Sequence, residues 1–194
     1  MSRSKVSRVL RSLEELAKKE FVPSVGPIKG RIISDVIRKY KAKNILEIGT
    51  LHGYSALLMA AALPSDGKVV TIELDKSIAD IARKNIADAE LSYKIDVRVG
   101  NALEVISNLD LEFDLLFLDA AKNEYLKYLK LAEKKSLKEG AIIVADNVEV
   151  SKNEMLDYLH YVRSSRIYKS YTIETTLEFT PHIKDAIEVS IKVA

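Results

Sequence analysis

The spacing of apolar residues changes near residue 44 and divides the chain into two parts. Before residue 44, apolar residues recur at helical spacing in two stretches. These residues are Val6, Val9, Leu10, Leu13, Leu16 and Ala17 in the first stretch, and Ile32, Ile33, Val36, Ile37 and Tyr40 in the second. Residues 21–27, which lie between them, include two prolines and one glycine and so predict a loop. We therefore expect residues 1–40 to form two amphipathic helices joined by a loop.

After residue 44, short apolar runs alternate with stretches of helical periodicity. The apolar runs predict strands at 44–48, 68–72, 95–99, 113–118 and 141–145, followed by two β-like runs at 168–177 and 183–193. The stretches between them predict helices at 54–63, 78–89, 123–135 and 153–163, and a short one from residue 102. This alternation is typical of an α/β fold in which helices cover both faces of a mostly parallel sheet.

Composition fits a single domain over residues 1–194 and excludes several kinds of chemistry. Lys and Arg number 30 against 28 Asp and Glu, a balance that does not favour an obligate nucleic-acid binder. No cysteine is present, which excludes disulfides, thiolate catalysis and Cys-ligated zinc. No apolar run approaches the ~20 residues of a membrane span, and the first residues lack the apolar core of a signal peptide. We therefore expect a cytoplasmic protein that does not contact a membrane.

A glycine-containing loop follows the first predicted strand. Gly49 and Gly53 allow a sharp turn and the close approach of a ligand, and the helix that follows can hold an anion at its N-terminus. The spacing G-x-x-x-G differs from the G-x-G-x-x-G of dinucleotide sites, which argues against NAD. Glu73 lies just past the second predicted strand, where an acid typically accepts hydrogen bonds from ribose hydroxyls. Together these features favour an adenosine-type cofactor.

Two further strand ends carry oxygen ligands. The fourth predicted strand ends at Asp119, and the fifth ends at Asp146 and Asn147. Because the carboxyl ends of parallel strands meet at one edge of a sheet, we expect these side chains to lie together. Such a set suits a hard cation such as Mg²⁺. Each residue alone could equally be a helix cap or a turn former.

Lys122 follows Asp119 by three residues, so that its amine can return to the same site. A nearby divalent cation would disfavour its protonated form, which makes Lys122 a candidate general base. The three histidines, His52, His160 and His182, have neither the spacing of a metal site nor that of a catalytic triad.

With these residues in place, the chain resembles the cation-dependent O-methyltransferases typified by catechol O-methyltransferase, a family that also includes enzymes acting on caffeoyl-CoA and on hydroxyuridine in tRNA. The resemblance runs from about Val25 to near the C-terminus. Its strongest pieces are the segments 25–30, 47–55, 117–125 and 145–148.

The resemblance implies a Rossmann-like seven-stranded sheet with a reversed last strand, and S-adenosylmethionine (SAM) as cofactor. It implies that residues 1–40 cover the site. The implied cofactor contacts are Val25, Glu47, Gly49, Ser55, Glu73, Ala102 and Asp119. The implied ligands of Mg²⁺ are Asp119, Asp146 and Asn147, with Lys122 as the base. Lys122, Asn147 and Glu178 would contact the methyl acceptor.

The acceptor implied by the resemblance is a catechol-like or other vicinal-diol aromatic molecule. Two departures leave it open, because Ala120 and Ala121 stand where the catechol enzyme has larger residues near adenine and the substrate. The alternative with the same chemistry is a tRNA hydroxyuridine O-methyltransferase. A nucleotide-dependent oxidoreductase is disfavoured by the glycine spacing, and a binding protein without catalysis by the complete set of Asp119, Lys122, Asp146 and Asn147. The oligomeric state, including a homodimer, is open.

Overall fold

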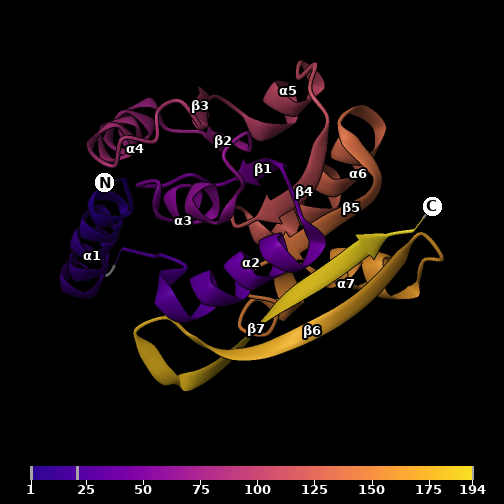
Figure 1. Ribbon diagram of the computed structural model, residues 1–194. Helices are drawn as coiled ribbons and strands as arrows, with labels where there is room; N and C mark the ends of the chain where they lie inside the picture. Colours follow the sequence, from indigo (N-terminus) through magenta and orange to yellow (C-terminus); the bar gives the residue numbers. More distant parts are fainter. Residues whose placement is uncertain (1, 21, 194) are drawn as a thin grey trace.

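Seven strands form one mixed sheet at the centre of the computed structural model, which describes residues 2–20 and 22–193 (Figure 1). The strands are β1 (Asn44–Ile48), β2 (Lys68–Glu73), β3 (Ile95–Val99), β4 (Phe113–Leu118), β5 (Leu137–Ala145), β6 (Tyr168–Leu177) and β7 (Thr180–Lys192). Their order across the sheet is β3-β2-β1-β4-β5-β7-β6, and only β7 runs antiparallel to both of its neighbours. The expected α/β fold with a reversed last strand is thus confirmed.

Helices cover both faces of this sheet. The helices on one face are α1 (Ser2–Glu20), α2 (Gly26–Tyr40), α3 (Tyr54–Ala62) and α4 (Lys76–Asp88). Those on the other face are α5 (Ala102–Ser107), α6 (Tyr125–Lys135) and α7 (Leu156–Ser164), with short 3₁₀ turns at Lys122–Glu124 and Lys152–Glu154. Alternate residues of the central strands feed the two apolar cores, as Ile45 and Leu46 of β1 do, and both are fully buried.

The register of the parallel strands brings four chain segments to one edge of the sheet. Ile48 at the end of β1 pairs with Ile72 of β2 and with Leu118 of β4, and Leu118 pairs with Ala145 of β5. The residues that follow continue the ladder, because Asp119 N–H donates to Ile48 O at 3.0 Å and Asp146 N–H donates to Leu118 O at 3.1 Å. Residues 49, 73, 119 and 146 therefore emerge side by side.

The reversed strand β7 extends this edge toward α2. Its residue Glu188 pairs with Ala145 of β5, and Val148 N–H donates to Ala186 O at 3.1 Å. Asp185 is thereby placed beside the segment that follows β5. In Figure 1 the β6–β7 hairpin also reaches past the beginning of α2 toward the lower end of α1.

Several predicted boundaries change in the structure. The loop predicted for residues 21–27 is wrong at its end, because α2 begins at Gly26 and includes Pro27 in its first turn. Proline is tolerated there because the backbone N–H groups of a first turn have no acceptor within the helix. Phe21 lies outside the described residues. The fifth strand begins at Leu137, four residues before the apolar run, because Leu137 pairs with Phe113 across a register shift. The other predicted strands and helices are confirmed, with α7 beginning three residues later and β7 three residues earlier than predicted, and the remaining ends within two residues.

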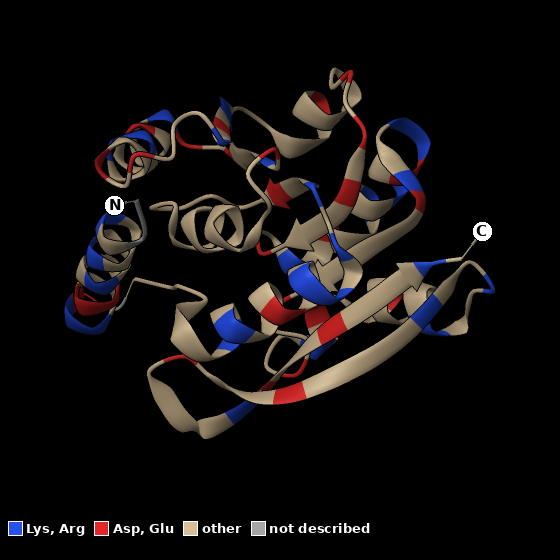
Figure 2. Ribbon diagram, in the orientation of Figure 1, with Lys and Arg blue, Asp and Glu red and all other residues tan. Residues whose placement is uncertain are grey.

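Within the described residues, no helix is both long enough and apolar enough to cross a lipid bilayer. Basic and acidic side chains both occur on α1 and α4, whereas α3 carries no charge and is buried against the sheet (Figure 2).

Candidate active site

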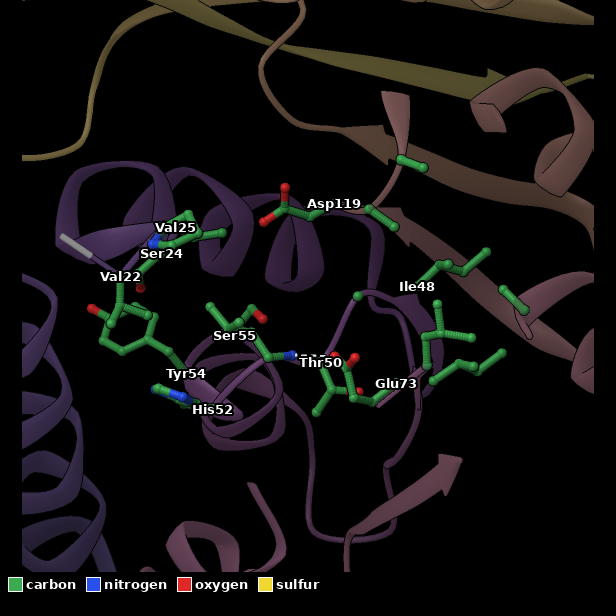
Figure 3. Close-up of a pocket in the computed structure, with 18 of the residues that line it drawn as sticks. Val22, Ser24, Val25, Ile48, Thr50, His52, Tyr54, Ser55, Glu73 and Asp119 are labelled. Atoms are coloured by element: carbon green, nitrogen blue, oxygen red, sulfur yellow. Dashed lines mark hydrogen bonds between the residues drawn. The ribbon is translucent and has the colours of Figure 1, made fainter. Parts of the chain in front are cut away.

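A cavity of about 360 Å³ lies at the carboxyl ends of β1, β2 and β4, and we call it the first cavity. Figure 3 shows Ser24, Val25, Ser55, Glu73 and Asp119 arranged around it. Of the seven predicted cofactor contacts, six line it: Val25, Gly49, Ser55, Glu73, Ala102 and Asp119. Leu13 and Ala17 of α1 close one side, so the N-terminal helix contributes to the wall.

The loop after β1 gives the first cavity its floor. Gly49 has a φ of 100°, and a Cβ at this position would collide with the backbone carbonyl of Asp119. Gly53 precedes α3 and has no side chain to cap it. The first hydrogen bond of the helix runs from Leu57 N–H to Gly53 O at 3.0 Å. The preceding amides of α3 are therefore free of intrahelical acceptors and can bind an anion beside the Ser55 hydroxyl.

The Glu73 carboxylate is held in one orientation by two backbone amides. Its Oε2 accepts a hydrogen bond from Leu51 N–H at 2.9 Å, and its Oε1 accepts one from Asp75 N–H at 3.1 Å. Each carboxylate oxygen can accept a second hydrogen bond, and the side chain borders the first cavity. The carboxylate can therefore accept hydrogen bonds from the hydroxyls of a bound sugar.

Glu47 is the one predicted cofactor contact that does not line the first cavity. Its side chain is fully buried under the loop, and neither carboxylate oxygen makes a hydrogen bond of regular geometry. Burial raises its pKa to about 8, and the hydroxyls of Ser55 and Thr71, which lie nearby, offset this only in part. The protonated form is thus favoured near neutral pH. Contact of Glu47 with a cofactor stays a prediction.

A second cavity of about 380 Å³ adjoins the first. Both are lined by Asp119 and by residues 17 and 22–24, so they share one wall. The second cavity is also lined by Lys29, Asp146, Asn147 and Glu178, together with Phe179 of the β6–β7 turn. It thus gathers the three predicted metal ligands and the predicted acceptor contact Glu178.

The two aspartates each have one oxygen bound to a lysine. Asp119 Oδ1 accepts from Lys122 Nζ at 2.8 Å, and Asp146 Oδ1 lies 2.7 Å from Lys29 Nζ. Within the described part of the chain, no hydrogen bond reaches Oδ2 of either residue. Burial and the neighbouring Asp119 raise the pKa of Asp146, while Lys29 opposes this rise. A cation between the two free oxygens would relieve this repulsion.

Asn147 supplies a third oxygen. Its Nδ2 donates to Asp185 Oδ2 at 3.0 Å, which leaves its amide oxygen available in the second cavity. In residues 2–20 and 22–193, no group of three or more His, Cys, Asp or Glu side chains is arranged to bind a metal ion. The predicted site is not such a group, because its third oxygen belongs to the amide of Asn147. Two carboxylate oxygens and one amide oxygen fit a hard cation such as Mg²⁺, which keeps further positions for water or a ligand.

Glu178 lines the second cavity together with the predicted metal ligands. It accepts a hydrogen bond from Lys29 N–H at 3.0 Å, and burial raises its pKa, although this hydrogen bond opposes the rise. Gly26 has a φ of 64°, and a Cβ there would collide with the Glu178 carboxylate. The close approach of the β6–β7 turn to the start of α2 therefore depends on this glycine.

Lys122 lies at the shared wall but lines neither cavity. Its Nζ donates to Asp119 Oδ1 and to the Tyr125 hydroxyl, each at 2.8 Å. Tyr125 is fully buried and donates in turn to Leu118 O at 2.9 Å. These contacts hold the amine at the carboxylate that borders both cavities, and action as a base requires the side chain to turn from Tyr125 toward the second cavity.

The sequence interpretation missed two charged residues of the site, Lys29 and Asp185. Lys29 belongs to the segment 25–30 and receives no role from the sequence pattern, and Asp185 is the first residue of the buried run of β7. A lysine is rarely buried unless it is paired with an acid. The position of Lys29 on the apolar side of α2 is therefore a signal in the sequence that it has a buried partner. Its partners, however, lie more than 100 residues away in the sequence.

Comparison with known proteins agrees with this geometry. The sequence profile of a family described as O-methyltransferase matches residues 2–156. A catechol O-methyltransferase of Niastella koreensis is 41% identical over 138 residues, which cover 69% of this chain and 62% of that protein. A catechol O-methyltransferase of Mus musculus is 31% identical, over 98% of this chain and 80% of the mouse protein. The chain thus spans less than two thirds of the first of these relatives.

Solved structures give the same result. The O-methyltransferase TomG of Streptomyces achromogenes, involved in tomaymycin synthesis and solved with SAM, is 27% identical with a TM-score of 0.85, over 96% of this chain and 90% of that one. An O-methyltransferase of Bacillus cereus solved with SAH is 30% identical with a TM-score of 0.82, over 97% and 90% of the two chains. The resemblance expected from the sequence is confirmed: the chain belongs to the O-methyltransferase family.

Proposed function

We propose that this protein transfers the methyl group of SAM to a hydroxyl oxygen of a small aromatic molecule with vicinal hydroxyls, with help from a divalent cation. The observation that carries the proposal is the meeting of two cavities at Asp119. One cavity has the features of an adenosine site, and the other gathers the three free oxygens of Asp119, Asp146 and Asn147.

Residues of the first cavity bind and orient the cofactor. The Glu73 carboxylate accepts hydrogen bonds from the ribose hydroxyls, while the Ser55 hydroxyl and the first amides of α3 bind the carboxylate of the methionine moiety. Val25 and Ala102 supply apolar walls. Because the first cavity ends at Asp119, the methyl group would lie at the wall shared with the second cavity.

Residues of the second cavity hold the acceptor. Glu178 lines the second cavity and would accept a hydrogen bond from one hydroxyl, while Lys122 Nζ, once turned from Tyr125, would take the proton of the other. A bound divalent cation would lower the pKa of a hydroxyl and fix its orientation. The protein's main contribution is then alignment, because two reactants held in adjacent cavities need no further encounter.

Transfer of labelled methyl from SAM tests the proposal. Acceptors are catechol, a caffeoyl ester and tRNA that carries hydroxyuridine, each with Mg²⁺ and with EDTA. We expect transfer to the aromatic diols that EDTA abolishes and Mg²⁺ restores. Full transfer in EDTA would contradict the role of the cation, and transfer to tRNA alone would replace the small-molecule acceptor.

A further inference from the structure

A buried charge network lies beneath the three proposed metal ligands. Lys29 of α2 reaches across to Asp146 Oδ1 at 2.7 Å and to Asp185 Oδ2 at 2.5 Å. The side chains of Lys29 and Asp185 are 1% and 0% exposed. Buried charges of this kind are costly unless each one is paired, so the network must be complete in the folded protein.

Asp185 is the centre of this network. Its Oδ2 accepts from Lys29 Nζ and from Asn147 Nδ2, and its Oδ1 accepts from Val150 N–H at 3.2 Å and from Glu149 N–H at 3.4 Å. Asp185 lines neither cavity and its side chain is fully buried, so it lies behind Lys29 and Asn147, which line the second cavity. Its carboxylate therefore joins α2, the segment after β5, and β7.

The bond from Asn147 decides which amide atom faces the cavity. A carboxylate can only accept hydrogen bonds, so the amide nitrogen must point to Asp185 and the amide oxygen must point away from it. Asn147 also has a φ of 60°, a left-handed conformation that asparagine adopts more readily than most other residues with a Cβ. The bonds from residues 149 and 150 to Asp185 hold the same segment in place.

We propose that Asp185 is a positioning residue that preassembles the oxygen ligands of the cation site. It orients the amide of Asn147 and holds Lys29 against Oδ1 of Asp146, which leaves Oδ2 of Asp146 for the cation. Lys29 Nζ lies between the two carboxylates, at 2.7 Å from Asp146 Oδ1 and 2.5 Å from Asp185 Oδ2. This inference rests on the proposed function, because it presupposes a cation at Asp119, Asp146 and Asn147.

The substitution Asp185→Asn tests the inference with almost no change of volume. Either orientation of the new amide places its NH₂ group against donors, namely Lys29 and Asn147 on one side and the amides of residues 149 and 150 on the other. We expect affinity for Mn²⁺, measured by the electron paramagnetic resonance of the free ion, to fall about 10- to 100-fold. SAM affinity, measured by calorimetry, should stay within about twofold.

A matched control separates this effect from general loss of stability. Glu188 is a buried acid on the same strand, paired with Arg163 Nε at 2.8 Å and outside both cavities. Glu188→Gln should lower the melting temperature without changing Mn²⁺ affinity. An equal loss of Mn²⁺ affinity in both variants would contradict a specific role for Asp185.

A double variant separates orientation from charge. Lys29→Met with Asp185→Asn removes one cation and one anion, so the net charge of the cluster is unchanged. We expect Mn²⁺ binding to stay weak, because the new carboxamide can accept from Asn147 Nδ2 only by turning its NH₂ group against the amides of residues 149 and 150. Recovery to within about twofold of the wild-type affinity would show that Asp185 acts only through charge and would overturn the inference.

The single variant and the wild type separate failure of the inference from failure of the proposed function. If the wild type binds Mn²⁺ and Asp185→Asn binds it equally well, only the inference is contradicted. If the wild type binds no Mn²⁺, the proposed function is contradicted as well.

Discussion

The two cavities share Asp119 but are built from different kinds of contacts. The first cavity is made largely by backbone: a turn at Gly49, the free amides of α3, and a glutamate held by two amides of neighbouring residues. The second cavity depends on charged side chains from α2, β4, β5 and β7, which meet only in the folded chain. The comparison suggests that binding of the cofactor and binding of the cation can be disturbed separately.

The largest expected effect is on the second cavity, from Asp146→Asn. This variant keeps the shape of the side chain but removes a charged ligand, and a bound cation contributes several kcal/mol to the stabilisation of developing charge. We expect turnover to fall by about 10³-fold or more, with SAM affinity nearly unchanged. The assays are labelled methyl transfer and calorimetry with SAM.

The control for this variant is Asp114→Asn, since Asp114 lies at the opposite end of β4 and accepts from the amides of Lys43 and Asn44. Turnover should survive that change. A comparable loss of SAM affinity in Asp146→Asn would show that the two cavities are not separable.

The next effect concerns the wall that the cavities share. Lys122→Ala removes the proposed base and its bonds to Asp119 and Tyr125. Turnover should fall by about 10²-fold or more, as is usual for loss of a general base, while affinity for SAM and Mn²⁺ should change little. Lys127→Ala, on the exposed side of α6, is the matched control. Unchanged turnover in the Lys122 variant would remove its role as base.

A smaller effect is expected on the first cavity, from Glu73→Gln. A hydrogen bond to a charged group contributes about 1.5–3 kcal/mol, so SAM affinity should fall about tenfold or more. Mn²⁺ affinity should not change, which is the reverse of the result for Asp146→Asn. Glu104→Gln, an exposed acid of α5, is the control. Equal SAM affinity for wild type and Glu73→Gln would show that Glu73 does not hold the ribose.

The difference between the cavities also explains what the sequence could predict. Strands such as Phe113–Leu118 and the turn at Gly49 are determined by local pattern, so their positions follow from short apolar runs and glycine spacing. Asp119 and Asp146 were found because the ends of parallel strands always meet at one edge. Lys29 and Asp185 were not found because they are 156 residues apart, and their pairing depends on the reversal of β7.

The smallest effect concerns the stability of the loop that carries the first cavity. The pKa of Glu47 is about 8 in the folded protein against an ordinary 4.5, so the folded chain keeps a proton that the unfolded chain releases between these values. The contribution of this group to the free energy of unfolding is therefore full below pH 4.5 and is lost as the pH rises to about 8.

Glu47→Gln mimics the protonated form at every pH. Its advantage over wild type in the free energy of unfolding, measured by denaturant titration, should grow from about pH 5 to about pH 8, by at most about 1.4 kcal/mol per pH unit. Glu112→Gln, at an exposed position, should show no such trend. An advantage of Glu47→Gln that is the same at both pH values would mean that Glu47 is not protonated in the folded protein.

The adjacency of the two cavities is the central claim, and paramagnetic broadening tests it most directly. SAM labelled with ¹³C in its methyl group is bound to the protein, and Mn²⁺ is added while the methyl resonance is recorded. If the cation binds between Asp119, Asp146 and Asn147, Mn²⁺ will broaden this resonance strongly in wild type and far less in Asp146→Asn. A methyl resonance that stays sharp while Mn²⁺ binds tightly would contradict a cation site beside the reacting methyl group.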